Sequence, residues 1–272
     1  MLFFKNTDPS GRLPEGLARN EIPFVLRAPE GATCGSKIGG KPDVPADFVW
    51  PEFECEIYDG VRARLPLSFL CQIRLEEAAP FDRDGLLPKK GLLSFFYELS
   101  SHRGGYDPTD RGCFRVFYFE DAESLAPADP PEGAKELKEY GLSFSSGESY
   151  PAHEELCFRS DMRCDWDTYH AMLASKGYAP ECARHKLLGY ANVFQGEILS
   201  VCARNAESPA GGAQKTPGGD PSNWILLFQM ASIRDGDFRL LFGDDGNLYF
   251  YIRKEDLQNK RFDKAWFVLQ SY

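Results

Sequence analysis

The chain carries three short landmarks twice in the same order, and this repetition limits its fold more than any other feature of the sequence. The matching pairs are Lys37–Gly40 with Lys186–Gly189, Phe69–Ile73 with Leu226–Met230, and Gly91–Phe96 with Gly246–Tyr251. Gln72 precedes Gly91 by 19 residues, and Gln229 precedes Gly246 by 17. A two-fold duplication of one strand-rich unit explains this order. A chance similarity between apolar strands is the alternative, and the sequence leaves it open.

We therefore predict one domain over residues 1–272, with repeat halves at about 36–121 and 185–272 joined by 122–184. Short apolar and aromatic runs bounded by turn residues predict strands. These are residues 24–26, 65–74, 91–99, 113–120, 224–233, 238–242, 247–252 and 265–269. The runs 65–74 and 224–233 are apolar nearly throughout, which predicts burial on both faces.

Turn and helix signals complete the prediction. The Asp245-Gly246 pair between the runs 238–242 and 247–252 predicts a hairpin. Residues 167–176 predict a helix capped by Asp165 or Asp167 and ended by Gly177. Shorter helices are predicted at 134–140 and 255–264, and the Gly/Pro-rich segment 206–222 is predicted to be a mobile loop.

Charge and hydropathy exclude several classes of protein. With 31 basic and 41 acidic side chains, the net charge is −10, and no basic stripe is present. Such a chain is a poor ligand for nucleic acid or an anionic membrane. No apolar run is long enough to cross a bilayer, and the patch Leu2–Phe4 is too short for a signal-peptide core. We expect a soluble, cytoplasmic protein.

The cysteines point to the same compartment. None of the eight forms a CxxC pair, so the sequence offers no zinc-ribbon or thioredoxin motif. We expect all of them to be reduced and structural, because intracellular thiols stay free.

The landmarks, taken together, resemble the YwqG-like proteins. In the first half the resemblance rests on Lys37–Pro42, Trp50-Pro51, Pro66–Ile73 and Gly91–Tyr97, and in the second on His185–Tyr190, Leu226–Gln229 and Gly243–Phe250. It covers about residues 36–272. It implies an α+β fold with a duplicated, mostly antiparallel β-sheet unit and a few short helices. The N-terminus lacks the helix expected of that family, and the loop 206–222 is unusually long.

The resemblance implies little about function, because the family is a domain of unknown function without established catalytic residues. Some relatives lie near bacterial toxin and immunity genes or beside interaction modules, which favours a protein-binding role.

Eight residues are candidates for ligand binding. Gln72 and Gln229 are amides inside buried strands, so each must find hydrogen-bond partners. Either both face one cleft between the halves and hold a ligand, or each ties a neighbouring loop to the sheet, which we favour. Lys37, Gly39 and Gly40 could form an anion-binding nest, although a structural turn is the simpler interpretation and the Walker pattern is absent. The remaining candidates are His185, Gly189 and Asp244.

These last candidates have ordinary interpretations as well. His185 lies three residues after Cys182, but no third group is evident to orient a nucleophile. Asp235, Asp237, Asp244 and Asp245 lack the spacing of a calcium loop. We expect neither a metal nor a cofactor.

Two functions are compatible with these observations. The first is a non-enzymatic protein-binding module, an adaptor or a toxin antagonist, whose negative charge steers it toward a basic partner. The second is a small-molecule binder or hydrolase that uses a cleft between the repeats, lined by Gln72, Gln229, His185 and Lys37. We favour the first. The sequence does not identify the partner, the substrate or the oligomeric state.

Overall fold

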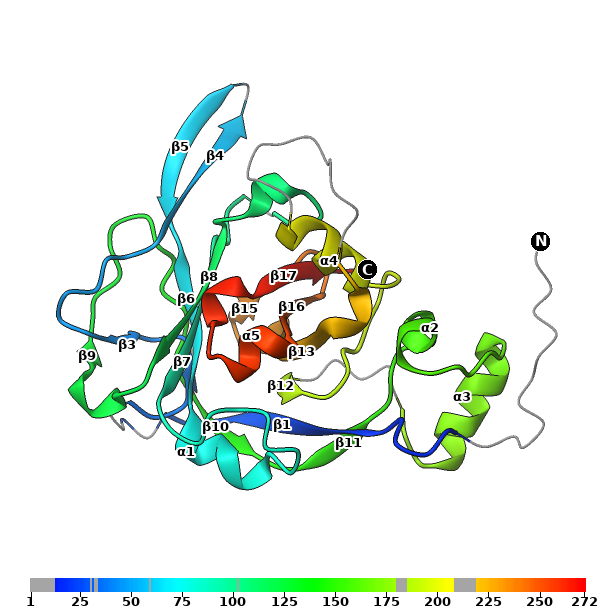
Figure 1. Ribbon diagram of the computed structural model, residues 1–272. Helices are drawn as coiled ribbons and strands as arrows, with labels where there is room; N and C mark the ends of the chain where they lie inside the picture. Colours follow the sequence, from blue (N-terminus) through cyan, green and yellow to red (C-terminus); the bar gives the residue numbers. More distant parts are fainter. Residues whose placement is uncertain are drawn as a thin grey trace.

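The aromatic runs of the sequence form the inner strands of one antiparallel sheet (Figure 1). The computed structural model describes residues 13–29, 31, 34–58, 60–101, 103–179, 185–207 and 219–272. The strands are β1 (Arg19–Arg27), β2 (Lys37–Ile38), β3 (Asp43–Val44), β4 (Glu52–Tyr58), β5 (Val61–Pro66), β6 (Ser68–Arg74), β7 (Leu92–Tyr97), β8 (Phe114–Phe119), β9 (Ala126–Pro127), β10 (Tyr140–Phe144), β11 (Gly147–Ser149), β12 (His185–Leu188), β13 (Trp224–Ala231), β14 (Ile233–Asp235), β15 (Phe238–Leu240), β16 (Asn247–Arg253) and β17 (Trp266–Gln270).

The main sheet has the strand order β17-β16-β13-β12-β1-β10-β2-β6-β7-β8, and β11 also pairs with β1. The first-half strands lie on one side of the central β1–β10 pair and the second-half strands on the other. All the pairings are antiparallel. The α+β class with a mostly antiparallel sheet and few short helices is therefore confirmed.

The sheet curves so strongly that its two sides pack against each other. Phe95 of β7 stacks on Phe228 of β13, with ring centroids 4.3 Å apart. Phe114 of β8 and Phe267 of β17, from opposite ends of the strand order, approach to 4.8 Å. Offset and tilted ring pairs at such distances contribute stability beyond the area that they bury. One hydrophobic core thus receives side chains from both halves.

The two long apolar runs are buried as predicted. Every residue of β13 is buried, and so is every residue of β6 except Arg74. The run 65–74 is nevertheless interrupted at Leu67, where β5 ends and β6 begins, so it contributes to two different sheets.

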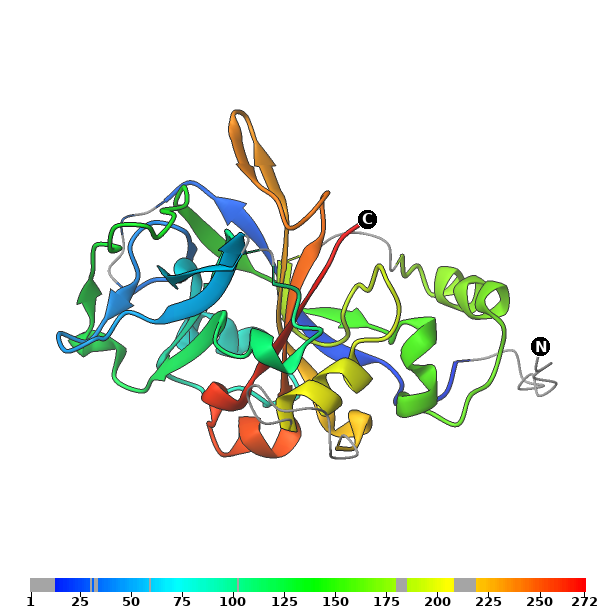
Figure 2. The ribbon, with the colours of Figure 1, turned by 90° about the horizontal axis from the view of Figure 1, so that it is seen from above.

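The helices are short and peripheral. They are α1 (Leu75–Ala78), α2 (Leu156–Arg159), α3 (Trp166–Ser175), α4 (Leu199–Glu207) and α5 (Lys254–Gln258). The prediction for α3 is confirmed: Asp165 accepts a hydrogen bond from the Thr168 N–H, and Gly177 follows the helix with φ +72°. Helices α2 and α3 lie beside the ends of β1 and β11, away from the rest of the sheet (Figure 2). No helix in the described ranges is long and apolar enough to cross a membrane.

Two local predictions are wrong. Residues 134–140 form no helix; the chain has no regular secondary structure before it enters β10 at Tyr140. The turn at 243–246 does not close a hairpin, since β15 pairs with β14 and β16 lies between β13 and β17. The hairpin turns instead at Gly236. The predicted mobile loop 206–222 lies largely outside the described residues, which resume at 219.

Candidate functional site

Gln72 anchors a loop of the first half to the sheet. It lies opposite Lys37 in the β2–β6 register. Its Oε1 accepts from the Asp43 N–H at 3.0 Å, and its Nε2 donates to Asp43 Oδ2 at 2.6 Å and to the Gly35 carbonyl at 2.9 Å. The fully buried amide is therefore saturated by its own loop.

Gln229 makes the corresponding contacts in the second half. It lies opposite Lys186 in the β12–β13 register. Its Oε1 accepts from the Asn192 N–H at 2.9 Å, and its Nε2 donates to Asn192 Oδ1 at 3.1 Å. Asp43 follows Lys37 by six residues, and Asn192 follows Lys186 by six. The two amides thus use equivalent partners.

The two amides do not face a common cleft. Phe95 and Phe228 stack on each other inside the shared core. Because successive side chains of a strand point to opposite faces, Gln229 points away from that core. Gln72 pairs with Ser94, the neighbour of Phe95, and points outward on the other side. The structure therefore does not bring Gln72 and Gln229 together around one ligand.

The glycine turns after β2 and β12 have the same backbone conformation. Gly39 and Gly40 have φ +65° and +67°, and Leu188 and Gly189 have +58° and +72°. The N–H of Gly39 donates to the Leu70 carbonyl and that of Gly40 to the Leu137 carbonyl. Both donors are already used within the protein, so these residues act as a turn and are not available as an anion nest.

His185 and Asp244 lie apart from these groups. The His185 ring stacks on Phe24 at 5.6 Å, and its Nδ1 accepts from the Ala231 N–H. Burial lowers the pKa of His185 to about 4. Cys182 lies outside the described residues. Asp244 is exposed in the turn before β16. No group of three metal-ligating side chains occurs among the described residues.

The lysine beside each amide is held differently in the two halves. Lys186 is fully buried, and its Nζ lies 2.8 Å from Glu21 Oε2. The Lys37 side chain is 12% exposed, and its Nζ lies 3.1 Å from Asp43 and 3.9 Å from Glu139. The corresponding position of the two halves thus holds a buried lysine beside Glu21 in the second half, and a partly exposed lysine beside Asp43 and Glu139 in the first.

A pocket of about 440 Å³ opens beside Lys37. We call it the Lys37 pocket; its lining includes Lys37, Gly40, Lys41, Asp43, Glu136 and Glu139. Asp43 Oδ2 accepts from the Cys34 N–H, Gln72 and Lys37. Asp43 Oδ1 is buried and has no hydrogen-bond partner among the described residues. A buried acceptor without a donor is unfavourable, and the residue that carries it is part of the pocket lining.

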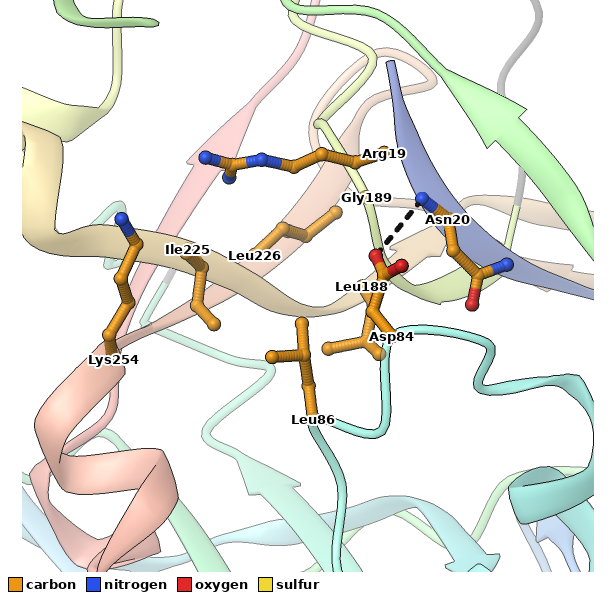
Figure 3. A pocket seen from close by; sticks show the side chains of 9 residues that line it. All are labelled: Arg19, Asn20, Asp84, Leu86, Leu188, Gly189, Ile225, Leu226 and Lys254. Carbon is orange, nitrogen blue, oxygen red and sulfur yellow. Dashed lines mark hydrogen bonds between the residues drawn. The ribbon is translucent and has the colours of Figure 1, made fainter. Parts of the chain in front are cut away.

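A second pocket of about 270 Å³ lies between β1, β12, β13 and α5 (Figure 3). We call it the Arg19 pocket; its lining includes Arg19, Asp84, Leu86, Gly189, Leu226 and Lys254. The Arg19 guanidinium and the Lys254 ammonium converge over Ile225 and Leu226 (Figure 3). Of the predicted site residues, only Gly189 lines this pocket, whereas Lys37 and Gly40 line the other.

Three buried thiols are not poised for nucleophilic chemistry. Cys71, Cys113 and Cys202 are buried, and burial raises the pKa of each thiol well above its ordinary value. Among the cysteines whose side chains the structure describes, Cys34, Cys71, Cys113, Cys157, Cys164 and Cys202 are free. A thiol with a raised pKa is a poor nucleophile, because the thiolate is the reactive form.

Sequence reasoning missed Asp43, Arg19 and Lys254. Asp43 could have been found by extending the alignment of the two halves beyond Gly40 and Gly189, because Asp43 then aligns with Asn192. No local signal identifies Arg19 or Lys254, because they come from opposite ends of the chain.

Comparison with known proteins places the chain in a family. No curated protein matches it. A family described as a domain of unknown function, DUF1963, matches residues 36–271, a span that holds both glycine turns and both buried amides. The chain therefore belongs to the DUF1963 family.

Proposed function

We propose that this protein is a non-enzymatic protein-binding module, an adaptor or antagonist, that takes a basic side chain of its partner in the Lys37 pocket. The observation that carries the proposal is the buried Asp43 Oδ1, which has no donor among the described residues. A lysine or arginine side chain supplies an N–H donor and the charge that this carboxylate favours.

The charges around the pocket support a cationic group. Asp43 and Glu139 both face Lys37, so this single lysine does not balance them. Two further lysines at the pocket are engaged by outer carboxylates: Lys41 with Asp129 at 2.5 Å and Lys138 with Asp235 at 2.6 Å. The net charge of −10 would steer a basic partner toward the protein.

We further propose that the chain is of the YwqG-like type and forms one domain with duplicated halves. Three correspondences support duplication: the Gln72 and Gln229 bonds, the left-handed turns after β2 and β12, and bulges at Phe69/Cys71 and Leu226/Phe228. On this view the Lys186–Glu21 pair is the sealed counterpart of the open Lys37 pocket. The first half alone would then carry the binding role.

The alternative of a hydrolase in a cleft between the repeats has less support. It requires Gln72, Gln229, His185 and Lys37 around one ligand, whereas each amide is bonded to the loop of its own half.

The test compares two aspartates of the same loop region. A labelled peptide with one lysine between glycines, capped at both ends, is titrated into the full chain and followed by fluorescence anisotropy. Asp43→Asn keeps an amide like that of Asn192 but removes the charge, and we expect binding to weaken roughly tenfold or more. Asp47→Asn, at an exposed position four residues after Asp43, is the matched control and should bind like wild type.

Two results would refute the proposal: no binding of the lysine peptide, or equal binding by Asp43→Asn. Acetylating the peptide lysine removes its charge and should abolish binding. In a cell extract, the relevant partner is one that wild type and Asp47→Asn retain and Asp43→Asn loses.

A further inference from the structure

We propose that the Arg19 pocket binds a monocarboxylate with a short apolar body, either a free organic acid or the C-terminal carboxylate of a peptide that ends in an apolar residue. This site goes beyond the proposed function. It involves other residues, on β1, β12, β13 and α5.

The first step is the unbalanced positive charge. Among the described residues, no carboxylate lies within ion-pair distance of the Arg19 guanidinium or the Lys254 ammonium. Arg19 instead lies over the Tyr190 ring, with Cζ 4.6 Å from the centroid. Asp84 lines the same pocket but forms an ion pair with neither cation. Two cations in a partly desolvated pocket repel each other, and an anion between them relieves that repulsion.

The titration of the two groups agrees with this geometry. Burial lowers the pKa of Arg19 and Arg159 adds to this shift, whereas Tyr190, Glu155 and Asp84 oppose it. Burial, with Arg19 and Arg159, also lowers the pKa of Lys254, and Asp220 opposes that shift. Arg159 is already engaged, because its Nε lies 3.8 Å from Glu155 and its other nitrogens donate to the Ser222 and Trp224 carbonyls. A bound anion is what the remaining two cations lack.

The second step is the apolar floor. Leu188, Ile225 and Leu226 are buried beneath the cations, and Leu86, which is 39% exposed, closes the opposite wall. Burying a methylene on such a surface is favourable. An inorganic anion would leave this floor uncovered, whereas a carboxylate on an alkyl or side-chain body covers it.

The third step is the polarity along the pocket. Asp84 lies at the end away from Lys254 (Figure 3), and its Oδ2 accepts from the Asn20 N–H at 3.3 Å. Its negative charge disfavours a second anionic group there. The pocket is also small, at about 270 Å³. A monoanion with a short body therefore fits better than a dianion or a long lipid.

The experiment titrates hexanoate into the full chain by calorimetry at low salt. Lys254→Met removes one cation at an exposed position, and we expect hexanoate to bind roughly tenfold or more weakly. Leu86→Ala should also weaken the binding of hexanoate, but it should not weaken the binding of acetate, because acetate has no apolar chain. Lys89→Met and Leu241→Ala are matched controls at exposed positions outside the pocket and should bind like wild type.

Two capped peptides separate the sources of the carboxylate. A peptide ending in leucine with a free carboxylate is compared with the same peptide amidated. Tighter binding of the free-carboxylate peptide than of hexanoate assigns the site to a protein C-terminus, and the reverse order assigns it to a free acid. The inference is overturned if neither hexanoate nor the free-carboxylate peptide binds at up to about 10 mM. It is also overturned if Lys254→Met binds hexanoate like wild type, or if the amidated peptide binds as well as the peptide with the free carboxylate. Asp43→Asn should bind hexanoate unchanged, so this test stands apart from that of the Lys37 pocket.

Discussion

Glu155 and His185 are buried titratable groups whose effects on stability run in opposite directions with pH. Burial raises the pKa of Glu155 to about 7, although Arg159 opposes the shift and the Tyr251 hydroxyl donates to Oε1. Burial lowers the pKa of His185 to about 4. Folded Glu155 keeps its proton where the unfolded chain has lost it, so stability falls as pH rises from about 4.5 to 7.

The histidine acts in the other sense. The unfolded chain protonates His185 near pH 6.5 and the folded protein only near 4, so stability is lost as pH falls between these values. Each shift of about 2.5 units corresponds to roughly 3 kcal/mol. Between about pH 4.5 and 6.5 both groups change the stability, and their effects offset each other.

Single substitutions should separate these contributions. In His185→Gln, which keeps an acceptor for the Ala231 N–H, stability should fall as pH rises from about 4.5 to 7. In Glu155→Gln it should fall as pH drops from about 6.5 to 4. Denaturant unfolding across this range measures both slopes, and Glu154→Gln at an exposed position is the control. Slopes identical to that of wild type would contradict the assignment.

The buried amides show how far the sequence can predict at this scale. A glutamine inside an apolar strand predicts hydrogen-bond partners, and the favoured role for Gln72 and Gln229, tying a loop to the sheet, matches their contacts. The sequence does not show that Asp43 keeps one oxygen unbonded, because that depends on how closely the loop closes over the sheet.

Among the elements, the Asp-Gly signal near the C-terminus illustrates competition between partners. Both Asp235-Gly236 and Asp245-Gly246 carry it, and only the first closes a hairpin. Strand β16 is long and apolar, and it is buried between β13 and β17. Pairing it with the three-residue β15 would leave much of that length unpaired. Tertiary burial therefore overrides a local turn signal.

The turn after β2 depends on close backbone approach as well as on its left-handed conformation. A Cβ on Gly39 would lie 2.3 Å from the Lys138 carbonyl oxygen, whereas one on Gly85, with φ +63°, would meet nothing within 4 Å. Gly85→Ala should therefore cost about 1 kcal/mol from backbone conformation alone. Gly39→Ala should cost clearly more, because the backbone of 137–138 must move.

Thermal and denaturant unfolding of the two variants measure this difference. Equal destabilisation by both substitutions would show that conformation alone matters at Gly39.

At the scale of the whole molecule, the repeat landmarks lie in corresponding strands, but the sequence does not predict what joins them. The central pair is β1, from the N-terminal segment, and β10, from the stretch that the sequence assigns to a connection. Neither strand lies in the stretches for which the sequence predicts a repeat. Pairing of segments so distant in the chain leaves no local pattern, because each strand is short and its partner is set by the closed sheet.

This arrangement predicts a single cooperative unit. Fragments 36–121 and 185–272 each lack β1 and β10, and each would expose one side of the Phe95–Phe228 contact. Neither fragment should show a cooperative thermal transition, while the full chain should show one by near-ultraviolet circular dichroism. A cooperative transition in an isolated fragment would show instead that a half folds alone.

The strand order has a further consequence. Two identical subunits related by a rotation axis must present the same residue on both sides of that axis. Here one chain supplies both halves of the sheet, so corresponding positions need not hold the same residue. Position 43 is an aspartate and position 192 is an asparagine, and each is bonded to the glutamine of its own half. Under the duplication proposed above, the presence of both halves in one chain removes the need for identical residues, so one half can keep a neutral asparagine where the other carries a charged aspartate.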